Sequence, residues 1–216
     1  SRMSGDGSGT AFAVPSAGGQ GEAVFRIPLL GQHNVMNAMA ALAVGRRFGL
    51  TDEQIAAGLA GARISGMRFE RHVTPQGWIV LNDAYNANPT SMRAALSVLA
   101  DMKGGRRIAV LADMLELGPQ EAALHYEIGA ELTPDTVDLL LTYGELGRHI
   151  AEGARGSLPA EAVRPFQDKM SLKAYLKQEV RPGDIVLVKA SRGMKLEEVV
   201  NDWIRNTDSS VGPREV

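Results

Sequence analysis

The chain has 216 residues and a mass of 23.1 kDa, and its 44% apolar and 22% charged residues exclude a disordered or low-complexity protein. A net charge of −2 and a pI of 6.1 argue against nucleic-acid binding, and the lack of cysteine excludes disulfides and thiolate metal sites. No apolar run reaches the roughly 18 residues of a membrane span and no signal peptide opens the chain, so we expect a cytoplasmic protein.

The first 66 residues contain weak strand signals followed by two helices. Apolar runs at Ala11–Val14 and Ala23–Leu30 predict short strands, behind a Gly- and Ser-rich start that is not typical of a well-formed domain. Helical spacing predicts a helix over His33–Phe48 and a second one, capped by Thr51, that ends near Ala60. The apolar stripe of the first helix consists of Val35, Met36, Met39, Leu42 and Ala43. Gly61–Gly66 is then expected to be a hinge.

From residue 67 the pattern alternates between strand and helix, which predicts an α/β fold with a doubly wound, mostly parallel sheet. The main strands are expected at Trp78–Leu81, Arg107–Leu111, Val137–Leu141 and Asp184–Val188, with weaker ones at Phe69–Thr74 and Val163–Phe166. Helices are expected at Pro89–Met102, Gln120–Leu132, Glu145–Ala154, Ser171–Glu179 and Lys195–Arg205. We therefore divide the chain into residues 1–66, residues 67–206 and a disordered tail over residues 207–216.

Polar loops follow several of the expected strands. In open α/β sheets, ligands bind beyond the carboxyl ends of the strands. The loops in that position are Asn82–Pro89, Ala112–Gly118, Tyr143–Glu145 and Lys189–Lys195. Each loop alone is explained equally well by ordinary turn residues, but three densely polar loops at one predicted edge favour a shared site.

Two residue pairs are candidates for nucleotide binding. Asn34 and Asn37 lie on one helix face, and carboxamides match the donor–acceptor edge of adenine. Their spacing alone favours a simpler interpretation, in which Asn34 caps the helix and Asn37 is solvated. Arg68 can bind phosphate oxygens, and Asp83 follows a strand where nucleotide folds place an acceptor for ribose hydroxyls. Both charges could equally be surface ion-pair partners.

Other chemistry has less support in the sequence. Asn88 before Pro89 predicts an N-cap, and the helix start behind it is a natural anion site. The four histidines show no metal-ligand spacing, and the sequence contains no Gly-x-Ser-x-Gly nucleophile motif.

Four motifs, in the same order, resemble the Mur ligases. Residues 31–38, Gly-Gln-His-Asn-Val-Met-Asn-Ala, are similar to a Gly-x-His-Asn-x-x-Asn segment of that family. The other three resemble the branch that adds D-Ala-D-Ala: Asp83–Pro89 with Ser91–Leu96, Val110–Gly118 with His125 and Gly129, and Lys189–Met194 with Glu197. The resemblance covers residues 29–200, with Ala84, Ala112 and Ala190 as small-for-small departures.

The resemblance implies that residues 1–66 end a central ATPase domain and that residues 67–206 form a C-terminal Rossmann-like domain. The family's Gly-Lys-Thr or Gly-Lys-Ser phosphate loop does not occur in the sequence, and its magnesium ligands precede the region covered. The full bacterial enzyme would use ATP and Mg²⁺ to phosphorylate the terminal carboxylate of UDP-MurNAc-tripeptide. The amine of D-Ala-D-Ala would then attack the resulting acyl phosphate. Such a reaction needs positioning and charge stabilisation more than a protein nucleophile. The chain alone is expected to be inactive.

Matching positions imply a role for each candidate residue. Asn34 and Asn37 would bind adenine, Asp83 the ribose and Arg68 the phosphates. The residues that would face D-Ala-D-Ala and the acyl phosphate are Asn86, Asn88, Ser191 and Arg192. Arg68 and Lys189 are the catalytic candidates, and no metal ligand is expected.

The resemblance leaves some roles and alternatives open. It does not say how Lys189, Asp113, Glu116 or His125 act. Another Mur ligase or a folylpolyglutamate-type ligase is the near alternative, which the motifs at residues 85–89 and 113–118 disfavour. A non-catalytic nucleotide-binding module is the alternative from a different class of protein.

Overall fold

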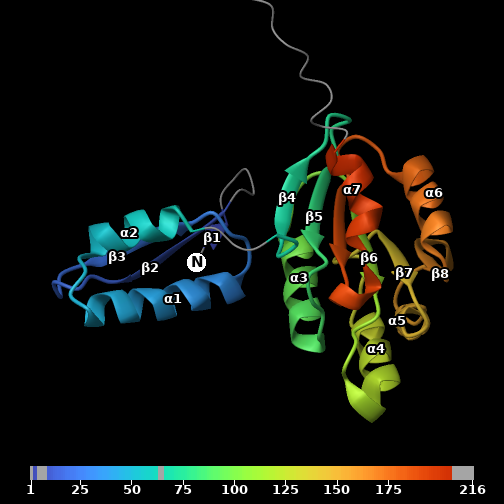
Figure 1. Cartoon of the computed structure of the whole chain (residues 1–216), viewed down its shortest axis with the longest axis horizontal. Helices are drawn as coiled ribbons and strands as arrows, with labels where there is room; N and C mark the ends of the chain where they lie inside the picture. Colours follow the sequence, from blue (N-terminus) through green and yellow to red (C-terminus); the bar gives the residue numbers. More distant parts are fainter. Residues whose placement is uncertain (1, 4–8, 63–65, 206–216) are drawn as a thin grey trace, which may run out of the picture. The chain divides into compact units, whose positions relative to one another are not determined.

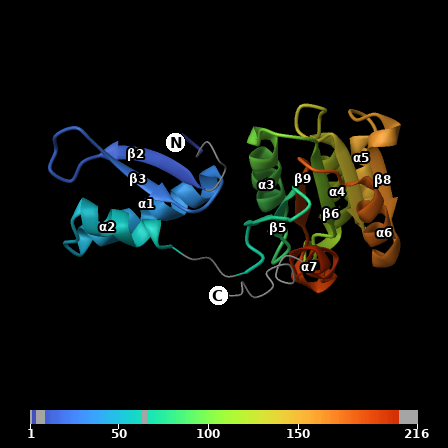
Figure 2. The same cartoon turned by 90° about the horizontal axis from the view of Figure 1, so that it is seen from above.

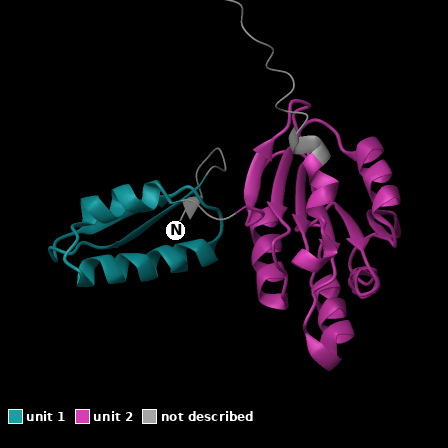
Figure 3. Cartoon of the chain, viewed as in Figure 1, with its two compact units in different colours: residues 1–65 teal, residues 66–216 magenta. Residues whose placement is uncertain are grey.

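The computed structural model of the chain describes residues 2–3, 9–62 and 66–205. The chain divides into two compact units, residues 1–65 and residues 66–216 (Figure 3). The tail predicted over residues 207–216 lies outside the described residues, as does the centre of the expected hinge, residues 63–65.

The first unit is an antiparallel sheet with two helices (Figure 1). Its elements are β1 (Arg2–Met3), β2 (Thr10–Pro15), β3 (Glu22–Ile27), α1 (Gln32–Arg47) and α2 (Asp52–Ala60). Phe12 of β2 pairs directly with Phe25 of β3, and their rings stack at 5.7 Å in a core that also holds Leu42 and Ile55. The two strands predicted in this region are therefore confirmed, and they form a regular ladder over their own core, whereas residues 1 and 4–8 of the Gly- and Ser-rich start lie outside the described residues.

The predicted apolar stripe of helix α1 is confirmed at Val35 and Leu42 and is wrong at its other three positions, since Ala43 is exposed like the two methionines. Val35, Ala38 and Leu42 are buried, whereas Met36 and Met39 are 60% and 40% exposed. At 100° per residue, Met39 falls beside the buried stripe and Met36 on nearly the opposite face of the helix. The cap of α2 is confirmed, since Thr51 and Gln54 form a reciprocal capping box.

The second unit contains a six-stranded sheet in the order β4-β5-β9-β6-β7-β8. Strand β4 pairs antiparallel with β5, and the remaining pairs are parallel, which confirms the mostly parallel α/β sheet. The strands are β4 (Glu70–Val73), β5 (Ile79–Asp83), β6 (Arg107–Ala112), β7 (Leu139–Tyr143), β8 (Val163–Phe166) and β9 (Ile185–Lys189). The strands predicted for this unit are all present; Val163–Phe166 has the predicted ends, and no end of the other strands is displaced by more than two residues.

Helices cover both faces of this sheet (Figure 2). One face carries α3 (Pro89–Asp101), α4 (Glu121–Ala130) and α5 (Gly147–Ala154), and the other carries α6 (Lys169–Glu179) and α7 (Glu197–Arg205). The described part of this unit also contains three short 3₁₀ turns: η1 (Gly118–Gln120), η2 (Ala160–Ala162) and η3 (Arg192–Met194). The chain runs one way from β5 to β8 and then returns to β9, so right-handed crossovers place α3–α5 and α6 on opposite faces.

The return of β9 positions the candidate site. Strand β9 inserts between β5 and β6, so the loops that follow these three strands are neighbours. The chain leaves β5 and β6 toward one face, and it leaves β9 toward α7 on the other. A reversal of this kind opens a crevice at the carboxyl ends of the strands, where ligands bind in open α/β sheets.

Candidate functional site

Ser191 joins the three loops at the carboxyl edge of the sheet. Its N–H donates to the carbonyl oxygen of Asp113 (3.2 Å), and its hydroxyl accepts from Leu115 N–H (2.9 Å) and donates to the Ala87 carbonyl oxygen (3.4 Å). The residue is 4% exposed. The prediction that the loops after β5, β6 and β9 share one edge is confirmed.

Lys189 and Asp83 form a second tie between two of these loops. The Lys189 ammonium lies 2.5 Å from Asp83 Oδ2 and 3.0 Å from the Asn86 carbonyl oxygen, and its side chain is 1% exposed. Asp83 Oδ1 also accepts the Phe69 N–H (3.1 Å). In this structure Lys189 and Ser191 hold loops together and do not present their polar groups at the open edge. The catalytic role of Lys189, the ribose contact of Asp83 and the substrate contact of Ser191 stay predictions.

Arg68 sits between two strained residues. Met67 and Phe69 have left-handed φ values of 60° and 56°, which cost a non-glycine residue about 1–2 kcal/mol each. Hydrogen bonds hold this segment: Met67 N–H donates to the Glu70 carboxylate (2.8 Å), and the Met67 carbonyl oxygen accepts from Tyr85 N–H (3.0 Å). Strain that is over-determined in this way is typical of functional sites.

Two guanidinium groups lie against one aromatic ring. The Arg68 guanidinium carbon is 4.1 Å from the centroid of the Tyr85 ring, and that of Arg192 is 5.2 Å away. Both arginines are exposed, and neither has a carboxylate partner among the described residues. Cation–π contacts hold the guanidinium groups in place and leave their N–H donors available. This arrangement suits a phosphate or carboxylate ligand.

The asparagines of the site have local roles in this structure. Asn88 caps α3 as predicted, since its side chain accepts from Ser91 N–H (2.8 Å). Asn86 is exposed, and its side-chain oxygen accepts from Ala87 N–H (2.9 Å). Neither contact tests the predicted contacts with substrate.

Asn34 and Asn37 lie in the first unit. Asn34 is buried and donates to the Leu30 carbonyl oxygen (2.8 Å), while Asn37 is exposed. The interpretation of Asn34 as helix cap is wrong, because the N-cap of α1 is Gly31 and makes no side-chain bond. The adenine contacts stay a prediction.

The loop after β6 contains the residues whose roles the sequence left open. Asp113 is buried and accepts Gly147 N–H (2.7 Å), and burial raises the pKa of its carboxyl. Gly144 has a φ of 105°, and a Cβ there would collide with the Asp113 carboxylate. Asp113 therefore fixes the β6 loop to the start of α5. Glu116 is exposed, with a left-handed φ of 65°.

His125 supports the same loop from α4. It is fully buried, and its Nε2 accepts the Met114 N–H at 2.8 Å. Its Nδ1 lies 2.6 Å from the Glu121 carbonyl oxygen, which can only accept, so Nδ1 carries the proton. Burial lowers the pKa of this imidazole, so the ring is neutral near pH 7.

Sequence reasoning missed Tyr85 and Glu70 as site residues. Tyr85 lies inside the motif at residues 83–89, so that motif was the available signal, whereas nothing in the sequence marks Glu70. Among the described residues, no group of three or more His, Asp or Glu could hold a metal ion. Within the same part of the chain, no helix is long and apolar enough to cross a membrane.

Comparison with known proteins gives consistent matches. Residues 67–192 match the family model for the Mur ligase, glutamate ligase domain. The UDP-N-acetylmuramoyl-tripeptide–D-alanyl-D-alanine ligase of Bacillus subtilis is 47% identical over 199 residues, which are 92% of this chain and 43% of that enzyme. The crystal structure of MurF from Acinetobacter baumannii matches with a TM-score of 0.79 and 30% identity, over 92% of this chain and 42% of that one.

A third match shows the fold alone. The MurF ligase of Thermotoga maritima, solved in complex with ADP, has a TM-score of 0.76 at 22% identity, over 94% of this chain and 44% of that one. The chain thus spans less than half the length of the relatives that it matches.

Proposed function

The chain belongs to the Mur ligase family by its glutamate ligase domain, and from this premise we propose that it is the C-terminal part of a UDP-N-acetylmuramoyl-tripeptide–D-alanyl-D-alanine ligase. The observation that carries the proposal is the pair Arg68 and Arg192 against Tyr85, where three loops converge. These loops contain the motifs that resemble the D-Ala-D-Ala-adding branch.

The proposed contribution of this part is to bind anions at the reacting centre. Arg68 binds phosphate oxygens of ATP, and Arg192 binds the carboxylate of D-Ala-D-Ala. Attack of the D-Ala-D-Ala amine on the acyl phosphate creates a negatively charged tetrahedral intermediate, which preorganised donors stabilise more in a dry site than water does. Lys189 and Ser191 hold the segments that carry Arg68 and Arg192 in fixed positions. ATP supplies the phosphoryl group. The described residues contain no group of three or more His, Asp or Glu that could hold a metal ion by itself, so we assign them no part in metal binding.

The remaining assignments complete the nucleotide and substrate contacts. Asn34 and Asn37 bind adenine, Asp83 binds the ribose, and Asn86 and Asn88 face D-Ala-D-Ala. We propose that the complete enzyme acts in the bacterial cytoplasm on UDP-MurNAc-tripeptide.

A chimera tests this function directly. In it, this chain replaces the matching 199-residue region of the Bacillus subtilis relative, which supplies the rest of the enzyme. We expect formation of UDP-MurNAc-pentapeptide, measured by mass spectrometry, together with stoichiometric phosphate release.

Alternative amines serve as the matched control. L-Alanine and 2,6-diaminopimelate, offered in place of D-Ala-D-Ala, should give no product. Product formation with either one alone would identify a different Mur ligase. A folded chimera that binds ATP without any ligation would instead support a non-catalytic module.

A further inference from the structure

We propose that His125 and Ser191 are positioning residues that place Arg192 for its substrate. They do so through a continuous chain of hydrogen bonds from α4, across the turn at residues 113–115, to the loop after β9. The kinetic consequence rests on the proposed function, whereas the coupling itself can be observed in this chain alone.

The first part of the chain of contacts runs from α4 to the turn. His125 accepts the Met114 N–H (2.8 Å), and the Glu121 carbonyl oxygen holds its other ring nitrogen (2.6 Å). The imidazole is 0% exposed, and Met114 is fully buried as well. The neutral ring therefore helps to fix the position of the turn from the side of α4, whereas Asp113 fixes the same loop to the start of α5.

The second part runs from the turn to Arg192. Leu115 N–H donates to the Ser191 hydroxyl (2.9 Å), and Ser191 N–H donates to the Asp113 carbonyl oxygen (3.2 Å). Gly193 also lies near the Leu115 side chain, since a Cβ added to Gly193 would come within 2.7 Å of Leu115 Cδ1. The turn η3, which begins at Arg192, is thus tied to residues 113–115 through the preceding residue, Ser191.

A histidine suits this position for a chemical reason. The ring must accept at Nε2 and donate at Nδ1, and only the neutral Nδ1–H tautomer does both. Glutamine can place its side-chain oxygen near the position of Nε2, whereas asparagine reaches only as far as Nδ1. This difference provides a matched pair of variants.

The first experiment measures the coupling by NMR in the 216-residue chain. In His125→Asn, we expect amide exchange of Leu115 to accelerate at least tenfold and the Arg192 Nε–H resonance to move, because the Tyr85 ring no longer shields it in the same way. In His125→Gln, both should stay close to wild type. An unchanged Arg192 resonance in a folded His125→Asn chain would overturn the proposal.

The second experiment measures ligation in the chimera. His125→Asn should raise the KM for D-Ala-D-Ala about tenfold while the KM for ATP changes less than twofold, and His125→Gln should restore the KM to within threefold. Equal effects on both KM values, or no rescue by glutamine, would show a merely structural role. If His125→Asn does not fold, Ser191→Ala replaces it, with the same expected shift of Arg192 and the same change in KM. If the chimera without substitutions shows no ligation while the NMR coupling is observed in the chain, the proposed function is refuted and the coupling is still supported.

Discussion

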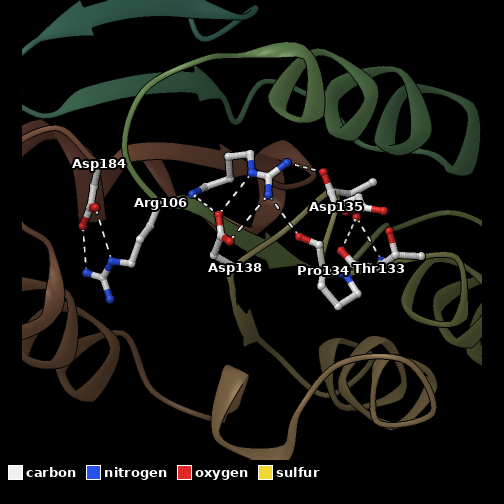
Figure 4. A network of polar contacts seen from close by, with 8 residues as sticks. Arg106, Thr133, Pro134, Asp135, Asp138 and Asp184 are labelled. Carbon is white, nitrogen blue, oxygen red and sulfur yellow. Dashed lines mark hydrogen bonds and ion pairs between the residues drawn. The ribbon is translucent and has the colours of Figure 1, made fainter.

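Arginine side chains have opposite roles at the two ends of the strands of the six-stranded sheet, the amino ends and the carboxyl ends. At the amino edge, where the strands begin, Arg106 binds the Asp184 carboxylate at 2.8 Å (Figure 4). It also binds the Glu179 carboxylate (2.7 Å), which joins the starts of β6 and β9 to the end of α6. Beside it, Arg107 binds Asp138 and the carbonyl oxygens of Pro134 and Asp135. Hydrogen bonds to Asp184 and Glu179 raise the pKa of Arg106 above its ordinary value.

The carboxyl edge leaves its arginines without such partners. Arg68 and Arg192 meet only the face of Tyr85 among the charged and aromatic contacts of the described residues. At the amino ends of the strands, the guanidinium groups bind carboxylates of the protein. At the carboxyl ends, the guanidinium groups of Arg68 and Arg192 have no such carboxylate among the described residues and can bind an anionic ligand. The arginines at the amino ends of the strands therefore stabilise the fold, and those at the carboxyl ends bind the ligand. Substitutions at the amino ends should lower the unfolding free energy, and substitutions at the carboxyl ends should raise KM.

Arg106→Met should give the largest loss of stability. It leaves Asp184, whose side chain is 4% exposed, without its charged partner. Breaking a buried pair costs about 3–5 kcal/mol, and the partial exposure of Arg106 reduces our expectation to about 2–3 kcal/mol of unfolding free energy. Urea unfolding measures this loss, and the ligation constants of the chimera should stay within twofold.

Arg107→Met is the control at the same edge. Its partner Asp138 is at the surface, so we expect a loss of only about 1 kcal/mol. Equal losses for the two variants would contradict the distinction between a buried and an exposed pair.

Arg192→Ala should have the reverse effect. A lost charge-assisted hydrogen bond costs about 1.5–3 kcal/mol, which raises the KM for D-Ala-D-Ala roughly tenfold or more. The unfolding free energy should fall by no more than about 1 kcal/mol, because the exposed side chain loses only its cation–π contact with Tyr85. Steady-state kinetics of the chimera measure the effect. A raised KM for ATP with an unchanged KM for D-Ala-D-Ala would place Arg192 on the nucleotide side instead.

A fall in pH should lower the unfolding free energy through the buried imidazole of His125. Its folded-state pKa is lowered below the ordinary 6.5, mainly by burial, so the unfolded chain takes up the proton first as the pH falls. Stability is then complete above pH 6.5 and is lost below it, by at most about 1.4 kcal/mol per pH unit, until the folded pKa is reached. His125→Gln should therefore show a flatter fall of unfolding free energy with acid. Equal slopes in the two proteins would contradict the buried neutral ring.

Tyr85→Leu should have the smallest effect. Each exposed cation–π contact is worth about 0.5–1 kcal/mol, so the loss of order in the two guanidinium groups should raise the KM for D-Ala-D-Ala about threefold. Tyr85→Phe keeps the ring and should behave as wild type. If the phenylalanine variant were as impaired as the leucine variant, the hydroxyl and not the ring would be the important group.

Much of the second unit could be predicted from the sequence. Buried parallel strands are continuous apolar runs, and the polar loops behind them stand out for that reason. The first unit was harder, because β2 and β3 alternate weakly and the partnership of Phe12 with Phe25 depends on their register.

The arrangement of the site was less predictable than its parts. Arg68, Tyr85 and Arg192 meet only because the last strand inserts between the first two parallel strands, and alternation of strands and helices does not determine that order. The left-handed Met67 and Phe69 carry no glycine signal. The burial of Ser191 and Lys189 likewise follows from the neighbouring loops and not from their own polar character.

Calorimetric titration with Mg-ATP, carried out side by side on this chain and on the chimera, tests most directly whether the carboxyl edge is one part of a larger site. The sequence contains no Gly-Lys-Thr or Gly-Lys-Ser phosphate loop, and a few contacts of about 1 kcal/mol each do not offset the cost of immobilising a ligand. We expect no binding to the chain tighter than about 1 mM, equivalent to about −4 kcal/mol, and binding at least about 100-fold tighter to the chimera. A micromolar dissociation constant for the chain alone would contradict this.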